Sequence, residues 1–189
     1  SLKKILLTKK EFKVFYRNKK TLDVTKSNIV QKQIRLIKPD IIINASGYTN
    51  VDMAEKEKKK AYNVNVNGPK NLSIAAKKNN SLLIHISTDY VFSGKKNKPY
   101  KETDKANPIS VYGKTKLLGE KEIFYFHDNF IIFRVSWLCG SDKANFITKM
   151  LELGLVNKNL KIISDQIGRP TFTHDFSKVL FKIIKKYNF

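Results

Sequence analysis

The sequence has one cysteine among its 189 residues and no long apolar run. The single thiol, Cys139, excludes an internal disulfide framework, so we expect a reducing, cytoplasmic setting. Cys139 follows an apolar run and is predicted to be a buried core residue and not a nucleophile. No apolar stretch approaches the ~20 residues of a membrane-spanning helix, so no membrane partner is expected.

Arginine is also scarce, although the formal net charge is +21. The basic residues are 33 Lys and only 4 Arg, and the Lys residues are spread through almost every segment. Arg has the planar fork that suits phosphate and base contacts, whereas dispersed Lys is typical of solvated helix faces. We therefore predict no specific nucleic-acid partner, although the positive field would favour an anionic nucleotide ligand.

Strand-like and helix-like patterns alternate along the chain. This alternation predicts an α/β fold with a doubly wound, Rossmann-like parallel sheet, in a single domain over residues 1–189. Predicted strands are Phe12–Tyr16, Leu22–Thr25, Asp40–Gly47, Leu82–Ile86, Phe130–Trp137 and Leu160–Ile163. Predicted helices are 1–10, a segment through Ile29–Ile37 capped by Thr25 or Ser27, most of 50–80 with a break at Gly68-Pro69, 116–124, 144–156 and a last one from about His174.

Two of the predicted strands end in small and polar residues. Asp40–Gly47 closes on Asn44-Ala45-Ser46, and Leu82–Ile86 leads into Ser87-Thr88-Asp89-Tyr90. Ligands bind at the carboxyl edge of the sheet in open α/β folds, so these residues are candidates for a binding site.

Tyr112 and Lys116 are four residues apart at the start of a helical pattern. This spacing places a phenol and an amine on one helix face, one turn apart. An ordinary phenol has a pKa of ~10, and a fixed positive neighbour would lower it. The pair can thus act as a general acid toward a carbonyl oxygen. Tyr16 and Lys20 have the same spacing, but they run from a predicted strand into a loop and are interpreted as a coincidence.

In combination, the motifs resemble those of the dTDP-4-dehydrorhamnose reductases, which belong to the extended short-chain dehydrogenase/reductases. The resemblance covers nearly the whole chain and is specific because many separate pieces share it. The pieces are STDYVFSG (Ser87–Gly94), PYKETD (Pro99–Asp104), VYGKTKLLGE (Val111–Glu120), NAS (Asn44–Ser46), VDxAE (Val51–Glu55), NxN (Asn63–Asn65), FRVSW (Phe133–Trp137), NF (Asn145–Phe146) and DQxGxPT (Asp165–Thr171).

The resemblance implies roles for the residues that match. Tyr112 would protonate the C4 oxygen of a nucleotide-linked deoxysugar, and Lys116 would hold the nicotinamide ribose and lower the Tyr112 pKa. Thr88 would hydrogen-bond the reacting oxygen and Tyr112. Asp89 and Trp137 would contact the sugar, although Trp137 could be only a core aromatic residue.

The cofactor implied by the resemblance is NADPH or NADH. Asn44, Ala45 and Ser46 would line its phosphate and ribose, and Asp23 and Val24 would lie near the adenine. Asp23 could instead cap the helix that follows it. The family substrate would be dTDP-4-dehydrorhamnose, and the sequence leaves open whether the protein forms a homodimer.

Glycine is absent ahead of Gly47, and neither GxGxxG nor GxxGxxG spacing occurs. A dinucleotide-binding fold opens with a strand and a Gly-rich turn that lets backbone amides approach the pyrophosphate. We therefore expect about 15 further residues, carrying that strand and turn, ahead of Ser1 in the complete protein. We also expect most of the family's C-terminal substrate-binding part to lie beyond this chain.

A second interpretation stays open. The β regulatory subunit of methionine adenosyltransferase shares much of the STDYVF and YGKTK pattern without being a reductase, whereas the DQxGxPT segment favours a reductase. Among the histidines, His85 is predicted to be a core residue, and His127 and His174 to be surface or cap residues. Because nothing clusters them, no metal site is predicted.

Overall fold

The structure is a computed structural model and describes residues 2–140, 145–162 and 164–187. The chain divides into two compact units. The larger unit is Arg17–Arg134, and the smaller unit combines Ser1–Tyr16 with Val135–Phe189. The single-domain organisation stays a prediction, and each unit is described by itself.

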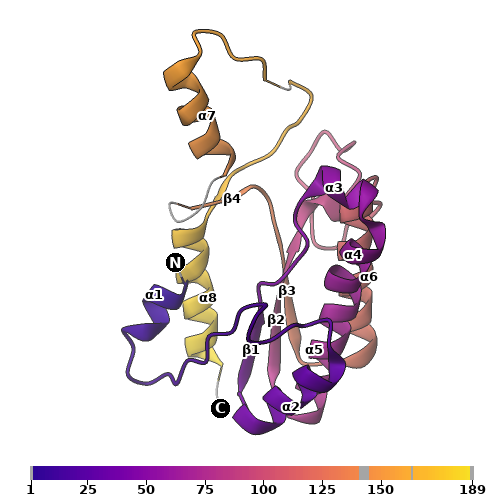
Figure 1. Cartoon of the computed structure of the whole chain (residues 1–189), viewed down its shortest axis with the longest axis vertical. Helices are drawn as coiled ribbons and strands as arrows, with labels where there is room; N and C mark the ends of the chain where they lie inside the picture. The colour runs from indigo at the N-terminus through magenta and orange to yellow at the C-terminus, as the bar shows by residue number, and fades with distance from the viewer. Residues whose placement is uncertain (1, 141–144, 163, 188–189) are drawn as a thin grey trace. The chain divides into compact units, whose positions relative to one another are not determined.

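The larger unit is built on a three-stranded sheet in the order β1-β2-β3 (Figure 1). β1 pairs with β2 in parallel, with Ile41 opposite Leu82 and Asn44 opposite His85. The elements are α2 (Ser27–Ile37), β1 (Ile41–Asn44), α3 (Val51–Lys56), α4 (Lys58–Tyr62), a π-helical segment (Asn63–Asn67), α5 (Gly68–Lys78), β2 (Leu82–Thr88), a 3-10 turn (Asp89–Val91), α6 (Val111–Phe126) and β3 (Phe130–Val135). This arrangement confirms the predicted parallel α/β architecture.

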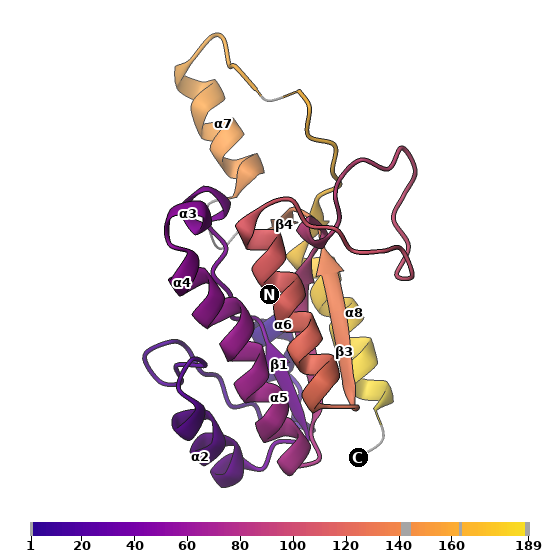
Figure 2. The ribbon, with the colours of Figure 1, turned by 90° about the vertical axis from the view of Figure 1, so that its right-hand side faces the viewer.

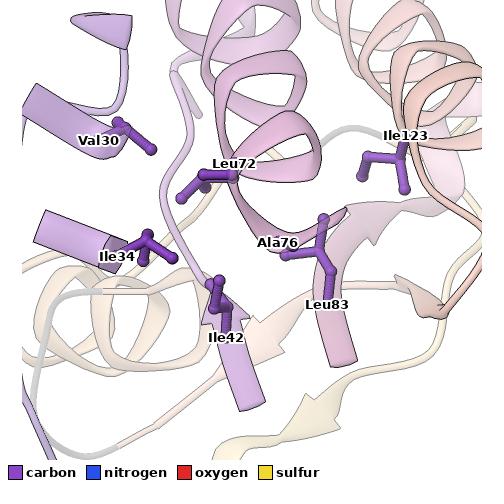
Figure 3. Packing of buried hydrophobic residues seen from close by; sticks show 8 residues of the cluster. Val30, Ile34, Ile42, Leu72, Ala76, Leu83 and Ile123 are labelled. Atoms are coloured by element: carbon purple, nitrogen blue, oxygen red, sulfur yellow. The ribbon is translucent and has the colours of Figure 1, made fainter. Parts of the chain in front are cut away.

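Helices α2, α5 and α6 lie on the same face of this sheet (Figure 2). Their apolar side chains meet those of the strands in one cluster, of which Figure 3 shows eight residues. The cluster consists of Val30, Ile34, Ile42, Leu72, Ala75, Ala76, Leu83 and Ile123. Burying a side chain as large as Leu or Ile contributes about 1.5–3 kcal/mol, so this cluster fixes how α5 and α6 lie on β2.

The long helical stretch predicted between residues 50 and 80 is present as α3, α4, the π-helical segment and α5. Asn50 caps α3 by accepting a hydrogen bond from the Met53 amide. α5 begins at Gly68, with Pro69 in its first turn, where the missing amide hydrogen costs least. The stretch was therefore predicted correctly, but the predicted interruption at Gly68-Pro69 is wrong: the backbone stays helical through Asn67 and Gly68, and it departs from helical geometry at Glu57 instead.

The smaller unit holds a two-stranded parallel sheet and three helices among its described residues. The elements are α1 (Leu2–Leu7), β4 (Leu138–Cys139), α7 (Phe146–Val156), β5 (Thr171–Phe172) and α8 (Thr173–Lys186). α1 packs against α8, and Leu6, Leu180 and Ile184 are buried. Cys139 is buried, as predicted.

Three predicted strands are wrong. Phe12–Tyr16 has no regular structure and packs through side chains instead, with the Phe12 ring edge-on to Phe181 of α8 at 6.1 Å. Leu22–Thr25 lies in a turn, and residues 160–162 are also irregular, while residue 163 lies outside the described part. Apolar residues in a short run do not make a strand unless another strand offers hydrogen bonds to it, and the described residues provide none there.

The predicted cap of α2 is also wrong. The N-cap is Lys26, which makes no side-chain capping bond. The Thr25 hydroxyl donates to the Asp23 carboxylate at 2.8 Å, and Ser27 is already the first helical residue. The predicted end at Lys38 is confirmed, because Lys38 is the left-handed C-cap ahead of Pro39.

Gly119 lies where α6 passes closest to the π-helical segment. A Cβ at this position would be 2.0 Å from the Asn65 carbonyl oxygen, a backbone atom that cannot move independently. We expect Gly119→Ala to destabilise the protein by about 2 kcal/mol, as overpacking does. Gly154 of α7 is the matched control, because its nearest neighbour would be 4.0 Å away. Gly154→Ala is therefore expected to raise the free energy of unfolding by about 0.5–1 kcal/mol, because Ala has a higher helix propensity than Gly. Urea unfolding measures the change in the free energy of unfolding for both variants. Changes of the same sign in the two variants would contradict the packing argument.

Candidate active site

Tyr112 and Lys116 both lie on the buried face of α6, and their exposed fractions are 9% and 4%. The start of the helix is held in two ways. The Ser110 side chain caps it by accepting from the Gly113 amide at 3.1 Å. The Glu55 carboxylate accepts from the Val111 amide at 2.8 Å. These contacts fix the turn that carries the phenol.

Gly113 lets this first turn of α6 approach the segment that follows β2. A Cβ on Gly113 would be 2.2 Å from the Tyr90 carbonyl oxygen, so only glycine fits without a shift. The approach brings the Tyr112 ring edge-on to the Tyr90 ring, with 5.5 Å between centroids. The glycine next to the phenol therefore determines where the phenol sits.

Thr88 is the last residue of β2, and its side chain faces Tyr112. The Thr88 hydroxyl donates to the Asp89 carboxylate at 3.1 Å and accepts from the Tyr90 amide at 3.3 Å. Burial raises the pKa of the Tyr112 phenol, while a hydrogen bond with the Thr88 side chain acts in the lowering direction. The net direction is upward, so the phenol keeps its proton through neutral pH.

The amine of Lys116 is turned toward β2. Its Nζ donates to the Ile86 carbonyl at 2.7 Å and lies 3.3 Å from Nε2 of His85. Burial lowers the Lys116 pKa to about 8, against a smaller raising effect of the Glu120 carboxylate. In this arrangement the amine faces the strand, and burial is the largest influence on the Tyr112 pKa; the predicted lowering of that pKa by Lys116 stays a prediction.

Asn44 and Ser46 lie at the end of the neighbouring strand, β1. Oδ1 of Asn44 accepts from the Ser46 amide at 3.0 Å and from its hydroxyl at 2.6 Å. The Asn44 amide nitrogen is 2.9 Å from Nδ1 of His85. Asn44 is thereby linked to Lys116 through the imidazole of His85. Ala45, between Asn44 and Ser46, is exposed.

Asp23 and Val24 lie in the turn ahead of α2. The Asp23 carboxylate accepts from the Thr25 hydroxyl and from its amide at 3.0 Å, and these bonds lower its pKa. The carbonyl of Val24 accepts from the Asn71 side chain on α5 at 2.9 Å. Asp23 therefore orders a turn and is not the helix cap that the sequence left open.

Trp137 belongs to the smaller unit and has a positive φ of 43°. Its ring lies 5.3 Å from that of Phe146, and its carbonyl accepts from the Thr171 amide at 3.1 Å. The three residues come from three separate motifs, which the structure brings together within the smaller unit.

The remaining histidines differ in their surroundings. His127 is the C-cap of α6 and is buried, so the surface alternative predicted for it is wrong. His174 is exposed in the first turn of α8. Within the described residues, no group of three or more His, Cys, Asp or Glu side chains could hold a metal ion. Nor does that part of the chain contain a helix that is long and apolar enough to cross a membrane.

The sequence matches the family model described as the RmlD substrate binding domain over residues 2–188. The chain belongs to this family. A dTDP-4-dehydrorhamnose reductase of Aggregatibacter actinomycetemcomitans is 42% identical over 186 residues, which cover 98% of this chain and 63% of that protein. The spore coat polysaccharide biosynthesis protein SpsK of Bacillus subtilis is 37% identical over 91% of this chain and 61% of its own length. The RmlD-family chain thus spans about three-fifths of these curated relatives.

Solved structures show the same fold. A dTDP-4-dehydrorhamnose reductase from Bacillus anthracis in complex with NADP has a TM-score of 0.92 and 37% identity, covering 98% of this chain and 67% of that one. A reductase from Clostridium acetobutylicum has a TM-score of 0.94 and 38% identity, over 98% and 65% respectively. The predicted Rossmann-like fold is confirmed by this similarity.

Sequence reasoning missed the polar residues that surround Lys116. His85 was predicted as a core residue and is fully buried, but its contacts with Asn44 and Lys116 were not foreseen. Glu120 was quoted only as the end of a motif, yet its buried carboxylate accepts from Ser87 and Arg134. The available signal was spacing, because Glu120 follows Lys116 by one helical turn.

Proposed function

We propose that the protein to which this chain belongs reduces the C4 keto group of dTDP-4-dehydrorhamnose to dTDP-L-rhamnose, with NADPH or NADH as the hydride donor. The observation that carries the proposal is the buried Tyr112–Lys116 pair of α6 beside Thr88, at the carboxyl end of β2. The names of the relatives and the NADP complex of the Bacillus anthracis reductase support the reaction and the cofactor class.

The residues present fit the nicotinamide half of such a cofactor. A buried phenol, a buried amine and the Thr88 hydroxyl meet where β2 ends, and the Ser46 hydroxyl with the Asn44 amide lies at the end of the adjacent β1. Polar groups at the carboxyl ends of neighbouring parallel strands are the usual place for a nucleotide. The bound cofactor would supply the hydride.

The chain's own residues would act on the proton and on the positions of the reacting groups. Tyr112 keeps its proton because burial raises its pKa, so it can donate to the C4 oxygen as charge develops there. Thr88 would hydrogen-bond the same oxygen, and Lys116 would hold the nicotinamide ribose. Asp89 and Trp137 would contact the sugar.

The remaining proposed contacts concern the rest of the cofactor. Asn44, Ala45 and Ser46 would line its phosphate and ribose, and Asp23 with Val24 would lie near the adenine. In that case the product would serve nucleotide-sugar metabolism of cell-surface polysaccharides, as the name of the SpsK relative also suggests for that protein.

The direct test is oxidation of NADPH by the natural protein with dTDP-4-dehydrorhamnose. We expect turnover with the keto sugar and none with dTDP-glucose, which carries no C4 keto group to reduce. A parallel assay with NADH decides the cofactor preference. A folded protein that binds NADPH without turnover, and that co-purifies with a methionine adenosyltransferase, would instead favour the regulatory-subunit interpretation.

A further inference from the structure

His85 is a fully buried imidazole that the proposed chemistry does not use. It lies inside β2, with Nδ1 at 2.9 Å from the amide nitrogen of Asn44 and Nε2 at 3.3 Å from the amine of Lys116. Both partners belong to the proposed reductase site. The imidazole is therefore the physical link between the end of β1 and the buried face of α6.

The hydrogen bonds around Asn44 determine which nitrogen of His85 carries the proton. The Ser46 backbone amide can only donate, so the Asn44 atom facing it must be the oxygen. The Asn44 nitrogen then faces His85, and an amide nitrogen also only donates. Nδ1 must accept. A neutral imidazole has one proton, which is consequently on Nε2.

His85 stays neutral because burial lowers its pKa well below its ordinary value. Its Nε2–H therefore points at Nζ of Lys116. An ammonium has three donors and no acceptor, so a protonated Lys116 would place donor against donor. An unprotonated amine can accept from Nε2–H while it donates to the Ile86 carbonyl.

The other charged groups near this amine do not reverse the argument. Among the described residues, Glu120 of the same helix is the charged group that acts on Lys116, and it raises the Lys116 pKa. Arg134 of β3 donates to both oxygens of that carboxylate, the shortest bond being 2.7 Å. The Glu120 charge is thus already paired.

We propose that His85 is a positioning residue for Lys116: held by Asn44 as the Nε2–H tautomer, it favours the unprotonated amine and directs it at the Ile86 carbonyl. Its function in the site is to set the charge of Lys116, the residue assigned to the nicotinamide ribose. The inference rests on the proposed function only for that assignment, because the tautomer and the hydrogen bonds concern this chain alone.

The tautomer is tested without any substitution. Long-range proton–nitrogen NMR correlations of the natural protein, without cofactor, identify the protonated nitrogen of each imidazole. We expect His85 as the Nε2–H form at all values between about pH 5 and 8, the range in which an ordinary histidine titrates. An Nδ1–H tautomer, or titration of His85 in this range, would overturn the proposal.

The effect on Lys116 is tested with a matched pair of variants. In His85→Gln the amide reaches the place of Nε2, and its oxygen can accept from an ammonium. We expect this variant to raise the Lys116 pKa by about one unit. In His85→Asn the shorter amide can still accept from Asn44 but no longer reaches Lys116, so a smaller rise is expected.

The titration is followed by NMR of labelled lysine, with the Lys116 signal assigned by its loss in Lys116→Met. His127→Gln is the control for general damage, because His127 is also buried but bonds the Ser81 carbonyl instead. A folded His85→Gln protein with an unchanged Lys116 pKa would contradict the proposal. If the variants do not fold, the tautomer measurement still decides.

Failure of this inference can be told apart from failure of the proposed function. The NMR measurements need neither cofactor nor sugar. The expected tautomer and pKa shift in a protein without turnover would leave the inference standing and remove the reductase assignment. Turnover by a protein whose His85 is the Nδ1–H tautomer would remove the inference and leave the reductase assignment standing.

Discussion

Replacing Tyr112 with Phe is expected to lower kcat for the reduction by about 10²–10⁴-fold, the usual contribution of a positioned general acid. The phenol is buried against the Tyr90 ring, so the Phe variant keeps the packing and loses only the hydroxyl. Because burial raises its pKa above the ordinary value of about 10, the wild-type acid should remain protonated throughout neutral and mildly alkaline pH. No fall in kcat from its ionisation is therefore expected there.

Tyr125→Phe is the matched control, because Tyr125 lies on the same helix and is 82% exposed. Its kcat should stay within a factor of two of wild type, since ordinary surface changes cost less than about 0.5 kcal/mol. Steady-state NADPH oxidation measures both variants, and urea unfolding checks that both are folded. Tyr112→Phe with wild-type kcat would remove Tyr112 as the proton donor.

Arg134→Met is expected to destabilise the protein by about 3–5 kcal/mol, because it leaves a buried carboxylate without its cation. Glu120 is only 1% exposed, and Arg134 donates to it from Nε and Nη2. The Ser87 hydroxyl also donates to this carboxylate. The contacts of Glu120 therefore join α6 to β2 and β3, one helical turn after Lys116.

A double variant separates the pairing from simple packing. In Glu120→Met combined with Arg134→Met the unpaired charge is gone, so the double variant should be more stable than Arg134→Met alone. Asp128→Asn is the control for an exposed pair: the Lys77–Asp128 contact is short, but Asp128 is mostly exposed. Asp128→Asn should lower the free energy of unfolding, measured in urea, by less than about 1 kcal/mol. Strictly additive effects of the two buried changes would contradict the argument.

Much of the fold could be predicted because its signals are local. The helix predicted through Ile29–Ile37 is present as α2, which buries Val30 and Ile34 against α5 and the sheet and leaves Ile29 exposed. The break predicted at Gly68-Pro69 failed, because Pro69 lies in the first turn of α5, where its missing amide hydrogen is tolerated. The strand predicted at Phe12–Tyr16 failed, since a strand exists only where another strand pairs with it.

The candidate site was predictable in part, because some of its signals are also local in the sequence. A separation of four residues places Tyr112 and Lys116 on one helix face wherever that helix packs. The strand predicted over Leu82–Ile86 is present as β2, and it extends two residues further into the polar cluster, to Thr88. Asn44 and Lys116 are 72 positions apart in the printed sequence, and no local pattern links them through His85.

The sequence by itself determined which groups the site contains and which of them share a helix turn, because helical periodicity depends only on spacing. The tertiary structure decided their charge states. Packing α6 onto β2 removes water from both groups, so the Tyr112 pKa rises and the Lys116 pKa falls to about 8. Desolvation depends on what covers a group, and the covering strand and its histidine come from a distant part of the chain.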